Sequence, residues 1–92
     1  MKRYIVIAYD IEKDRKRREV AKLLEAWGKR VNKSVFECFI SDTELKKLRE
    51  KLQKKVKNGS DSILFYPLCV DCIDKIERMG LKLPEKKIVK IF

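Results

Sequence analysis

Asp10 is the side chain in this sequence that points most directly to chemistry. Its carboxylate ends a run of β-branched and aromatic residues, 4–9, that has the character of a short buried strand. The chain then reaches a cluster of fixed positive charge made of Arg15, Lys16, Arg17 and Arg18. A hard anionic ligand beside basic side chains suits a divalent cation, Mg²⁺ or Mn²⁺, held against a phosphate chain. We therefore interpret this region as a candidate site for metal and phosphate.

Both features also have plain structural explanations. Asp is common in turns and helix caps, so Asp10 could serve only to start the following helix. A charge run is usually a solvated helix face. However, the basic cluster falls in the first turn of the expected helix, where the helix dipole disfavours cations, and phosphate binding would explain this placement. A lone carboxylate binds Mg²⁺ poorly, but a two-fold dimer would supply a second copy of Asp10 across its axis.

The charge balance of the whole chain points to a polyanionic partner. Lys and Arg number 24 against 14 Asp and Glu, which gives a net charge of +10. Nucleic acid and an anionic membrane are the physical candidates for such a surplus. No apolar stretch approaches the ~20 residues that cross a bilayer. The start of the chain has no secretory apolar region either, so we expect a cytoplasmic protein that binds RNA or DNA and no membrane.

Composition also excludes several classes of enzyme. The sequence contains no histidine, which rules out Ser-His-Asp and Cys-His triads and HExxH zinc proteases. Catalysis would have to come from carboxylates, a metal or the remaining polar side chains. Charged residues make up 41% of the chain, with Lys and Glu dominant, and this bias favours a thermophilic source.

Three cysteines, Cys38, Cys69 and Cys72, are present, and the last two have CxxC spacing. A structural zinc site needs about four ligands, and the sequence offers neither a second CxxC nor a histidine. We therefore expect these cysteines to be buried as small hydrophobic residues, with a disulfide as the alternative.

The elements that position Asp10 follow from the spacing of apolar residues. We expect a strand over 3–9 and an amphipathic helix over about 14–27, with Gly28 as its C-cap. Residues 30–40 predict either two short antiparallel strands or one bent strand. Ser41 and Glu44 form a capping box for a second helix that buries Leu45, Leu48, Leu52 and Val56 and ends at Asn58-Gly59. Further expected elements are a strand over 62–68 with Pro67 at its end or at a sheet edge, a short helix over roughly 70–78 and a last strand at about 87–92.

This order predicts one α+β domain over 1–92 with the ferredoxin-like βαββαβ fold, in which two helices pack on one face of an antiparallel sheet. The last strand is additional to that core. It must cover an edge, either its own or that of a neighbour, and the second possibility builds a homodimer by strand addition. Tyr9 and Phe36 could stack on bases, although either could equally be a core residue. The glycine-containing signature of RNA-recognition domains has no match around Phe36.

Several motifs together resemble CRISPR-associated protein family two, the small partner of the adaptation integrase. They are Tyr9-Asp10, Arg17-Arg18-Glu19-Val20, Gly28, Arg30-Val31, Ser34-Val35-Phe36-Glu37 and Tyr66-Pro67-Leu68-Cys69, and the resemblance covers about the whole chain. It implies a ferredoxin-like homodimer with the last strand on the partner's sheet and a metal between the two Asp10 carboxylates. The family's usual Gln after Arg-Val is Asn32 here.

By position, the residues that match those the family uses near the cleft are Tyr9, Asp10, Arg17, Arg18, Arg30 and Phe36. We expect catalytic roles for Tyr9, Asp10, Arg17 and Arg18. With the rest of the basic cluster added, the expected nucleic-acid ligands are Arg15, Lys16, Arg17, Arg18, Arg30 and Phe36. The leading hypothesis is a metal-dependent endonuclease that acts on single-stranded RNA or double-stranded DNA within CRISPR adaptation. The alternative is a non-catalytic scaffold that bridges integrase dimers on DNA, and a third possibility is an RNA-cleaving toxin of related fold.

Overall fold

The apolar run before Asp10 forms strand β1 (Lys2–Asp10), which lies inside a four-stranded antiparallel sheet of order β2-β3-β1-β4. The structure is a computed structural model that describes residues 2–80. Along the chain, β1 is followed by α1 (Asp14–Glu25), β2 (Gly28–Asn32), β3 (Val35–Ser41), α2 (Asp42–Gln53), β4 (Ser62–Leu68) and the short α3 (Val70–Asp74). The expected last strand, about 87–92, lies outside the described residues.

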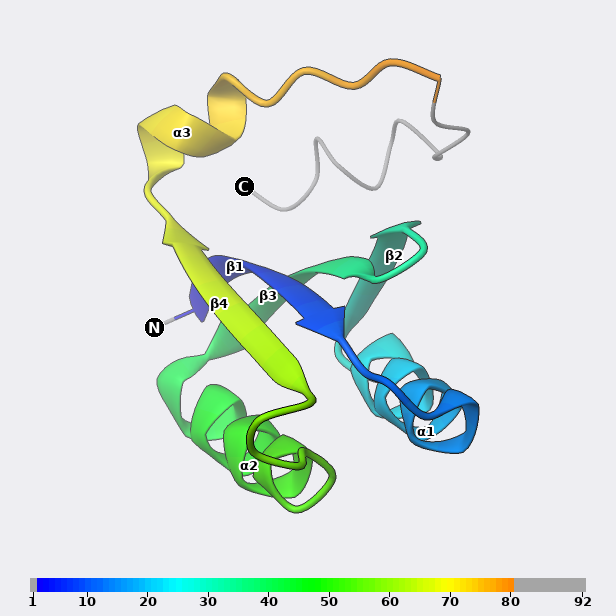
Figure 1. Cartoon of the computed structure of the whole chain (residues 1–92). Coiled ribbons are helices and arrows are strands. Elements are labelled where there is room, and N and C mark those ends of the chain that lie inside the picture. The colour runs from blue at the N-terminus through cyan, green and yellow to red at the C-terminus, as the bar shows by residue number, and fades with distance from the viewer. Residues whose placement is uncertain (1, 81–92) are drawn as a thin grey trace.

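This architecture confirms the ferredoxin-like α+β fold. Helices α1 and α2 cover one face of the sheet, as Figure 1 shows. Alternation along β1 directs Ile5, Ile7 and Tyr9 into the core between sheet and helices, and α1 and α2 meet them with the apolar stripes predicted from sequence. The buried helical residues are Val20, Ala21 and Leu24 on α1 and Leu45, Leu48 and Leu52 on α2.

The start of α2 is confirmed in detail, but the ends of both long helices were predicted wrongly. Ser41 Oγ accepts from the Glu44 N–H at 3.1 Å, and Glu44 Oε1 accepts from the Ser41 N–H at 2.8 Å, which completes the capping box. α2 then ends at Gln53, and Val56 is half-buried in the following loop. α1 ends at Glu25.

Gly28 is not the C-cap of α1; it is the first residue of β2. A Cβ atom at this position would collide with the Glu37 carbonyl oxygen and the Cys38 sulfur on β3. The glycine therefore allows β2 and β3 to approach closely, a requirement set by packing between strands that no local pattern reveals.

The segment 30–40 forms two strands, as one of the two alternatives predicted. β2 and β3 pair antiparallel, with an irregularity in register between Arg30 and Asn32. Pro67 lies in β4, which is an edge of the described sheet, so the edge interpretation is confirmed. The last helix covers Val70–Asp74, which is shorter than the expected 70–78.

The cysteines differ from one another. Cys38 is buried in the core, as expected, but Cys69 and Cys72 are exposed free thiols, so the prediction of burial was wrong for these two. They lie just beyond β4 on a short helix that buries only Ile73.

A polar cluster fastens the segment after α3 to the sheet face that the long helices leave free. The Arg78 guanidinium donates to the Glu37 carboxylate at 2.6 and 3.0 Å, and the Tyr4 hydroxyl donates to the same carboxylate. Glu37 and Arg78 retain only 10% and 16% of their side-chain exposure. Burial, together with the neighbouring Glu37 carboxylate, raises the pKa of Tyr4 well above its ordinary value.

Replacing Glu37 by alanine should lower the free energy of unfolding by about 2–4 kcal/mol, because the Arg78 guanidinium would be left without its partner in a mostly buried position. Urea unfolding measures this change. Arg15→Ala is the matched control, since the Arg15–Glu19 pair is exposed, and its loss should cost less than about 1 kcal/mol. Equal losses in free energy of unfolding would show that the buried cluster stabilises the fold no more than an exposed ion pair does.

Candidate nucleic-acid and metal site

Asp10 is exposed and lies on the sheet face opposite α1 and α2. It follows Val6 and Ala8 at the period of two that places strand residues on one face, and it pairs in register with Ser62 of β4. The N-cap of α1 is Lys13, so Asp10 does not cap that helix. Among residues 2–80, its carboxylate has no hydrogen bond or ion pair. The structural explanation for Asp10 as a helix cap is therefore wrong, and the carboxylate is available to a ligand.

The loop that follows Asp10 is held from two sides. Arg17 Nη1 donates to the carbonyl of Ile11 at 3.1 Å and the same guanidinium pairs with Asp14, which sets positive charge one residue beyond Asp10. On the other side, Asp61 accepts from the backbone N–H of Glu12 at 3.0 Å and from that of Lys57 at 2.9 Å.

These two backbone donors, Glu12 first, hold the pKa of Asp61 below its ordinary value. Asp61 therefore joins the loop after β1 to the loop before β4, and it positions Asp10 without touching it. Sequence reasoning missed this role, because the partners of Asp61 are distant in sequence.

A groove on the outside of α1 and β2 gathers most of the predicted phosphate ligands. It has a volume of about 280 Å³ and is lined by Arg17, Arg18, Ala21, Lys22, Glu25 and Arg30. We call it the basic groove, since four cations face a single carboxylate. Within the described chain, neither Arg18 nor Lys22 has a hydrogen bond or ion pair. Lys22 was missed from sequence, although its i,i+4 spacing from Arg18 on the helix was the signal that could have found it.

Two members of the basic cluster lie outside this groove. The Arg15 side chain is 86% exposed and pairs with Glu19 at 3.6 Å. Lys16 is half-buried and lies close enough to Asp61 to act on its charge. The four consecutive basic residues thus point in different directions, as the ~100° step between helical residues requires.

Tyr9, Phe36 and Arg30 form a stacked group that supports the hairpin of β2 and β3. The Tyr9 and Phe36 ring centroids are 6.2 Å apart, and the Arg30 guanidinium lies 5.8 Å from the Phe36 centroid. Arg30 also donates to the Lys33 carbonyl at 2.6 and 3.1 Å, and the Tyr9 hydroxyl donates to the same oxygen at 3.2 Å.

Phe36 is fully buried and Tyr9 is 4% exposed. Neither ring offers a face to a base, so the structure contradicts base stacking by Phe36 or Tyr9, whereas a catalytic role for Tyr9 stays a prediction. Both are core residues that hold the end of β1 and the guanidinium of Arg30 in place.

Residues 2–80 of a single chain do not enclose a metal ion here. Across residues 2–80, no group of three or more carboxylate or thiol side chains could do so. Asp10 nevertheless fits the donor chemistry of Mg²⁺ or Mn²⁺, because it supplies unpaired carboxylate oxygens, and such cations commonly take one or two carboxylates together with phosphate oxygens.

The sheet face around Asp10 is mostly apolar, apart from Ser62 beside Asp10 and Glu37 beside Val6. Register places Val6 beside Tyr66, and Ala8 beside Val35 and Leu64, on the same face as Asp10. Leu64 and Tyr66 remain 51% and 49% exposed, and Phe39 36%. We call this surface, made of Val6, Ala8, Val35, Phe39, Leu64 and Tyr66, the free sheet face.

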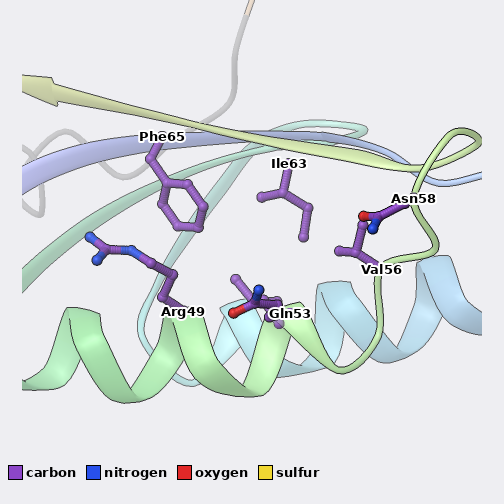
Figure 2. Close-up of a pocket in the computed structure, with 7 residues that line it drawn as sticks. Arg49, Gln53, Val56, Asn58, Ile63 and Phe65 are labelled. Atoms are coloured by element: carbon purple, nitrogen blue, oxygen red, sulfur yellow. The ribbon is translucent and has the colours of Figure 1, made fainter.

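A second cleft, between α2 and β4, does not belong to the site. It has a volume of about 290 Å³, and Figure 2 shows Phe65 and Ile63 of β4 above Arg49 and Gln53 of α2. None of its lining residues carries a carboxylate or a thiol. The Arg49 guanidinium lies 5.8 Å from the Phe65 ring centroid, so this end of the cleft is held by a cation–π contact.

Comparison with known proteins gives a consistent result. The family model described as CRISPR associated protein Cas2 matches residues 1–76. A "CRISPR-associated endoribonuclease Cas2 3" of Synechocystis sp. is 43% identical over 75 residues, which is 82% of each chain. A "CRISPR-associated endonuclease Cas2 2" of Thermus thermophilus is 35% identical over 98% of this chain and 97% of its own.

The fold has a solved counterpart as well. A chain in the structure described as a "Partial Cas6-RT-Cas1--Cas2 complex" aligns with a TM-score of 0.72 and 29% identity, over 87% of this chain and 92% of its own. In the described part of the present chain, no helix is long and apolar enough to cross a membrane.

Proposed function

Because this chain belongs to the CRISPR associated protein Cas2 family, we propose that it is a metal-dependent endonuclease of CRISPR adaptation that hydrolyses phosphodiester bonds as a homodimer. The observation that carries the proposal is the unpaired Asp10 carboxylate, which ends β1 on an exposed apolar sheet face and lies one residue from the Arg17 contact. The names of the two relatives support the activity, and the net charge of +10 supports a nucleic-acid substrate.

The homodimer is inferred from the free sheet face. Large apolar side chains such as Leu64 and Tyr66 rarely gather on a monomer surface without a partner. A second copy packed on this face would remove them from water, and a two-fold axis near the end of β1 would bring two Asp10 carboxylates together. Such a pair would supply the second carboxylate ligand that residues 2–80 of a single chain do not place beside Asp10.

The two Asp10 carboxylates, one from each subunit, would together hold one Mg²⁺ or Mn²⁺. When bound, that cation would supply Lewis-acid polarisation of the scissile phosphate and would acidify a water molecule. Arg18 and Lys22 would bind the nucleic-acid backbone in the basic groove, since neither has a competing partner in the described chain. Arg17 both holds the Ile11 carbonyl and offers positive charge where the phosphoryl oxygens become more negative.

Substrate class is part of the proposal. One relative is named an endoribonuclease and the other an endonuclease, so single-stranded RNA and double-stranded DNA are the two substrates to test. Cleavage of either by highly purified protein should require Mg²⁺ or Mn²⁺ and should stop when EDTA removes the metal. Cleavage that continues at full rate in EDTA would contradict the metal-dependent mechanism.

If the basic groove binds the phosphate backbone, the affinity for nucleic acid should fall as the salt concentration rises. Arg18→Ala combined with Lys22→Ala should weaken binding of a short single-stranded RNA and reduce the slope of log affinity against log salt by about 1–2. Fluorescence anisotropy at several salt concentrations measures both quantities. Lys57→Ala combined with Lys75→Ala removes the same charge from exposed positions outside the basic groove and outside α2, and should leave the slope nearly unchanged. An equal change in the two double variants would show that general charge, and not the groove, binds the strand.

A scaffold role is the second candidate, and a separate basic surface favours it. The exposed side of α2 carries Lys46, Lys47 and Lys51, and its C-cap is Lys54; all four lie outside the basic groove. Two such surfaces on a dimer could bind duplex DNA while an integrase performs the chemistry, and the similar chain in a complex named with Cas1 fits this role. If Asp10→Asn supports normal spacer insertion with the integrase, the scaffold is the biologically required function.

A further inference from the structure

The two exposed cysteines lie together at the junction of β4 and α3. Cys69 directly follows Leu68, the last residue of β4, and is the N-cap residue of α3, whereas Cys72 lies within the first turn of that helix. Their sulfur atoms are 3.1 Å apart. The third cysteine, Cys38, is 1% exposed in the core. The chain therefore carries one exposed pair of adjacent thiols and one buried thiol, and neither group belongs to the candidate nuclease site.

The geometry of the pair suits a covalent bond between the sulfurs. A disulfide has an S–S length of about 2.0 Å, so the two atoms must approach by only about 1 Å. Residues three apart on a helix are neighbours on its surface. Cys69 has an extended backbone, with φ −78° and ψ 167°, so its side chain is not fixed by the helix.

The structure supports metal binding by the same two thiols less well than it supports a redox reaction. A closed zinc site takes four ligands. Among residues 2–80, no group of three or more histidine, cysteine or carboxylate side chains surrounds these thiols. A two-electron redox reaction needs no further ligand.

We propose that Cys69 and Cys72 form a redox-active dithiol that closes reversibly to an intramolecular disulfide in the presence of a small-molecule disulfide. The Cys69 thiolate attacks one sulfur of the reagent, and the other sulfur leaves as a thiolate that takes up a proton. The Cys72 thiolate then attacks Cys69 Sγ and displaces the second thiol. Two protein thiols are oxidised, and one reagent disulfide is reduced to two thiols.

The environment sets the order of these two steps. A hydrogen bond from the Cys72 thiol, followed by one from the Cys72 backbone N–H, lowers the pKa of Cys69. The hydrogen bond with Cys69, followed by the negative charge of the Cys69 thiolate, raises the pKa of Cys72. Since the thiolate is the nucleophile, Cys69 attacks first and Cys72 resolves the mixed disulfide.

The disulfide would close a ring over Val70 and Asp71 at the point where the chain leaves the sheet. From there α3 leads through the buried Ile73 to Arg78, which binds Glu37 on the free side of the sheet. Oxidation would therefore restrain the start of the segment that covers Tyr4.

The test uses the full-length protein equilibrated in mixtures of oxidised and reduced glutathione, followed by alkylation and intact mass measurement. Wild type should lose two of its three free thiols without gaining glutathione, and on a denaturing, non-reducing gel it should migrate as a single chain with no disulfide to a second copy. Cys72→Ser should stop at a mixed disulfide on Cys69, and Cys69→Ser should react several-fold more slowly. Cys38→Ala is the control and should behave as wild type does.

Three outcomes would overturn the proposal. They are three alkylated thiols in wild type under the most oxidising mixture, a stable glutathione adduct in wild type, and a disulfide between chains as the main product. The number of free thiols does not depend on nuclease activity. This experiment can therefore contradict the dithiol proposal without affecting the proposed function.

Discussion

Replacing Asp10 by asparagine should reduce metal-dependent cleavage of RNA or DNA by about 100-fold or more while the protein remains folded. The substitution removes the charge that would hold the cation but keeps the size of the side chain, and no hydrogen bond or ion pair among residues 2–80 depends on that carboxylate. Loss of an electrostatic group at a reacting phosphate typically costs two orders of magnitude or more in rate. Initial rates with fixed substrate, together with an unfolding curve, separate loss of catalysis from loss of structure.

Glu12→Gln is the matched control for this prediction. Glu12 is also exposed, lies two residues beyond Asp10, and takes part in the described contacts through its backbone N–H. Its substitution removes the same charge from the same loop and should change the cleavage rate by less than a factor of a few. Full activity in Asp10→Asn would remove Asp10 from the mechanism. Equal losses in both variants would mean that the loop needs negative charge in general.

Replacing Leu64 by lysine should prevent formation of the proposed homodimer and abolish cleavage with it. Leu64 is 51% exposed on the free sheet face, so the monomer should tolerate the substitution. In a dimer, the two-fold axis would bury two new charges among apolar side chains at a cost of several kcal/mol. Sedimentation velocity should show monomers at concentrations where the wild type is dimeric, and the cleavage rate should fall in parallel.

Gln53→Lys adds the same charge on α2, on the opposite side of the sheet, and should leave both the association state and the rate unchanged. A Leu64→Lys protein that remains dimeric would place the dimer interface on another surface. A monomeric variant that still cleaves at the wild-type rate would contradict the shared metal site.

Much of the fold could be predicted because its signals are local. Three such signals depend only on residues that are close together in the sequence, and the structure confirms them. They are the alternation in β1, the capping box of Ser41 and Glu44, and the apolar stripes of the two helices. The helix ends and the role of Gly28 could not be predicted in this way, since they depend on the approach of Glu37 and Cys38 from another strand.

The site was predictable to a smaller extent for a related reason. Charge type and position led to Asp10, Arg17 and Arg18, whose roles stay predictions. The structure brings Arg17 and Arg18 together in the basic groove, and helical spacing could have added Lys22. Phe36 was predicted to contact nucleic acid because an aromatic side chain can either stack on a base or pack in the hydrophobic core. Only three-dimensional packing distinguishes these two roles. The role of Asp61 depends on backbone partners that are far away in sequence.

The central claim is that two Asp10 carboxylates, one from each subunit, share one divalent cation. Titration of the metal-free dimer with Mn²⁺, followed by calorimetry or by the paramagnetic signal of the free ion, measures the stoichiometry directly. We expect one high-affinity Mn²⁺ for every two chains, and we expect this binding to disappear in Asp10→Asn. One Mn²⁺ per chain, or binding that survives in Asp10→Asn, would contradict the claim.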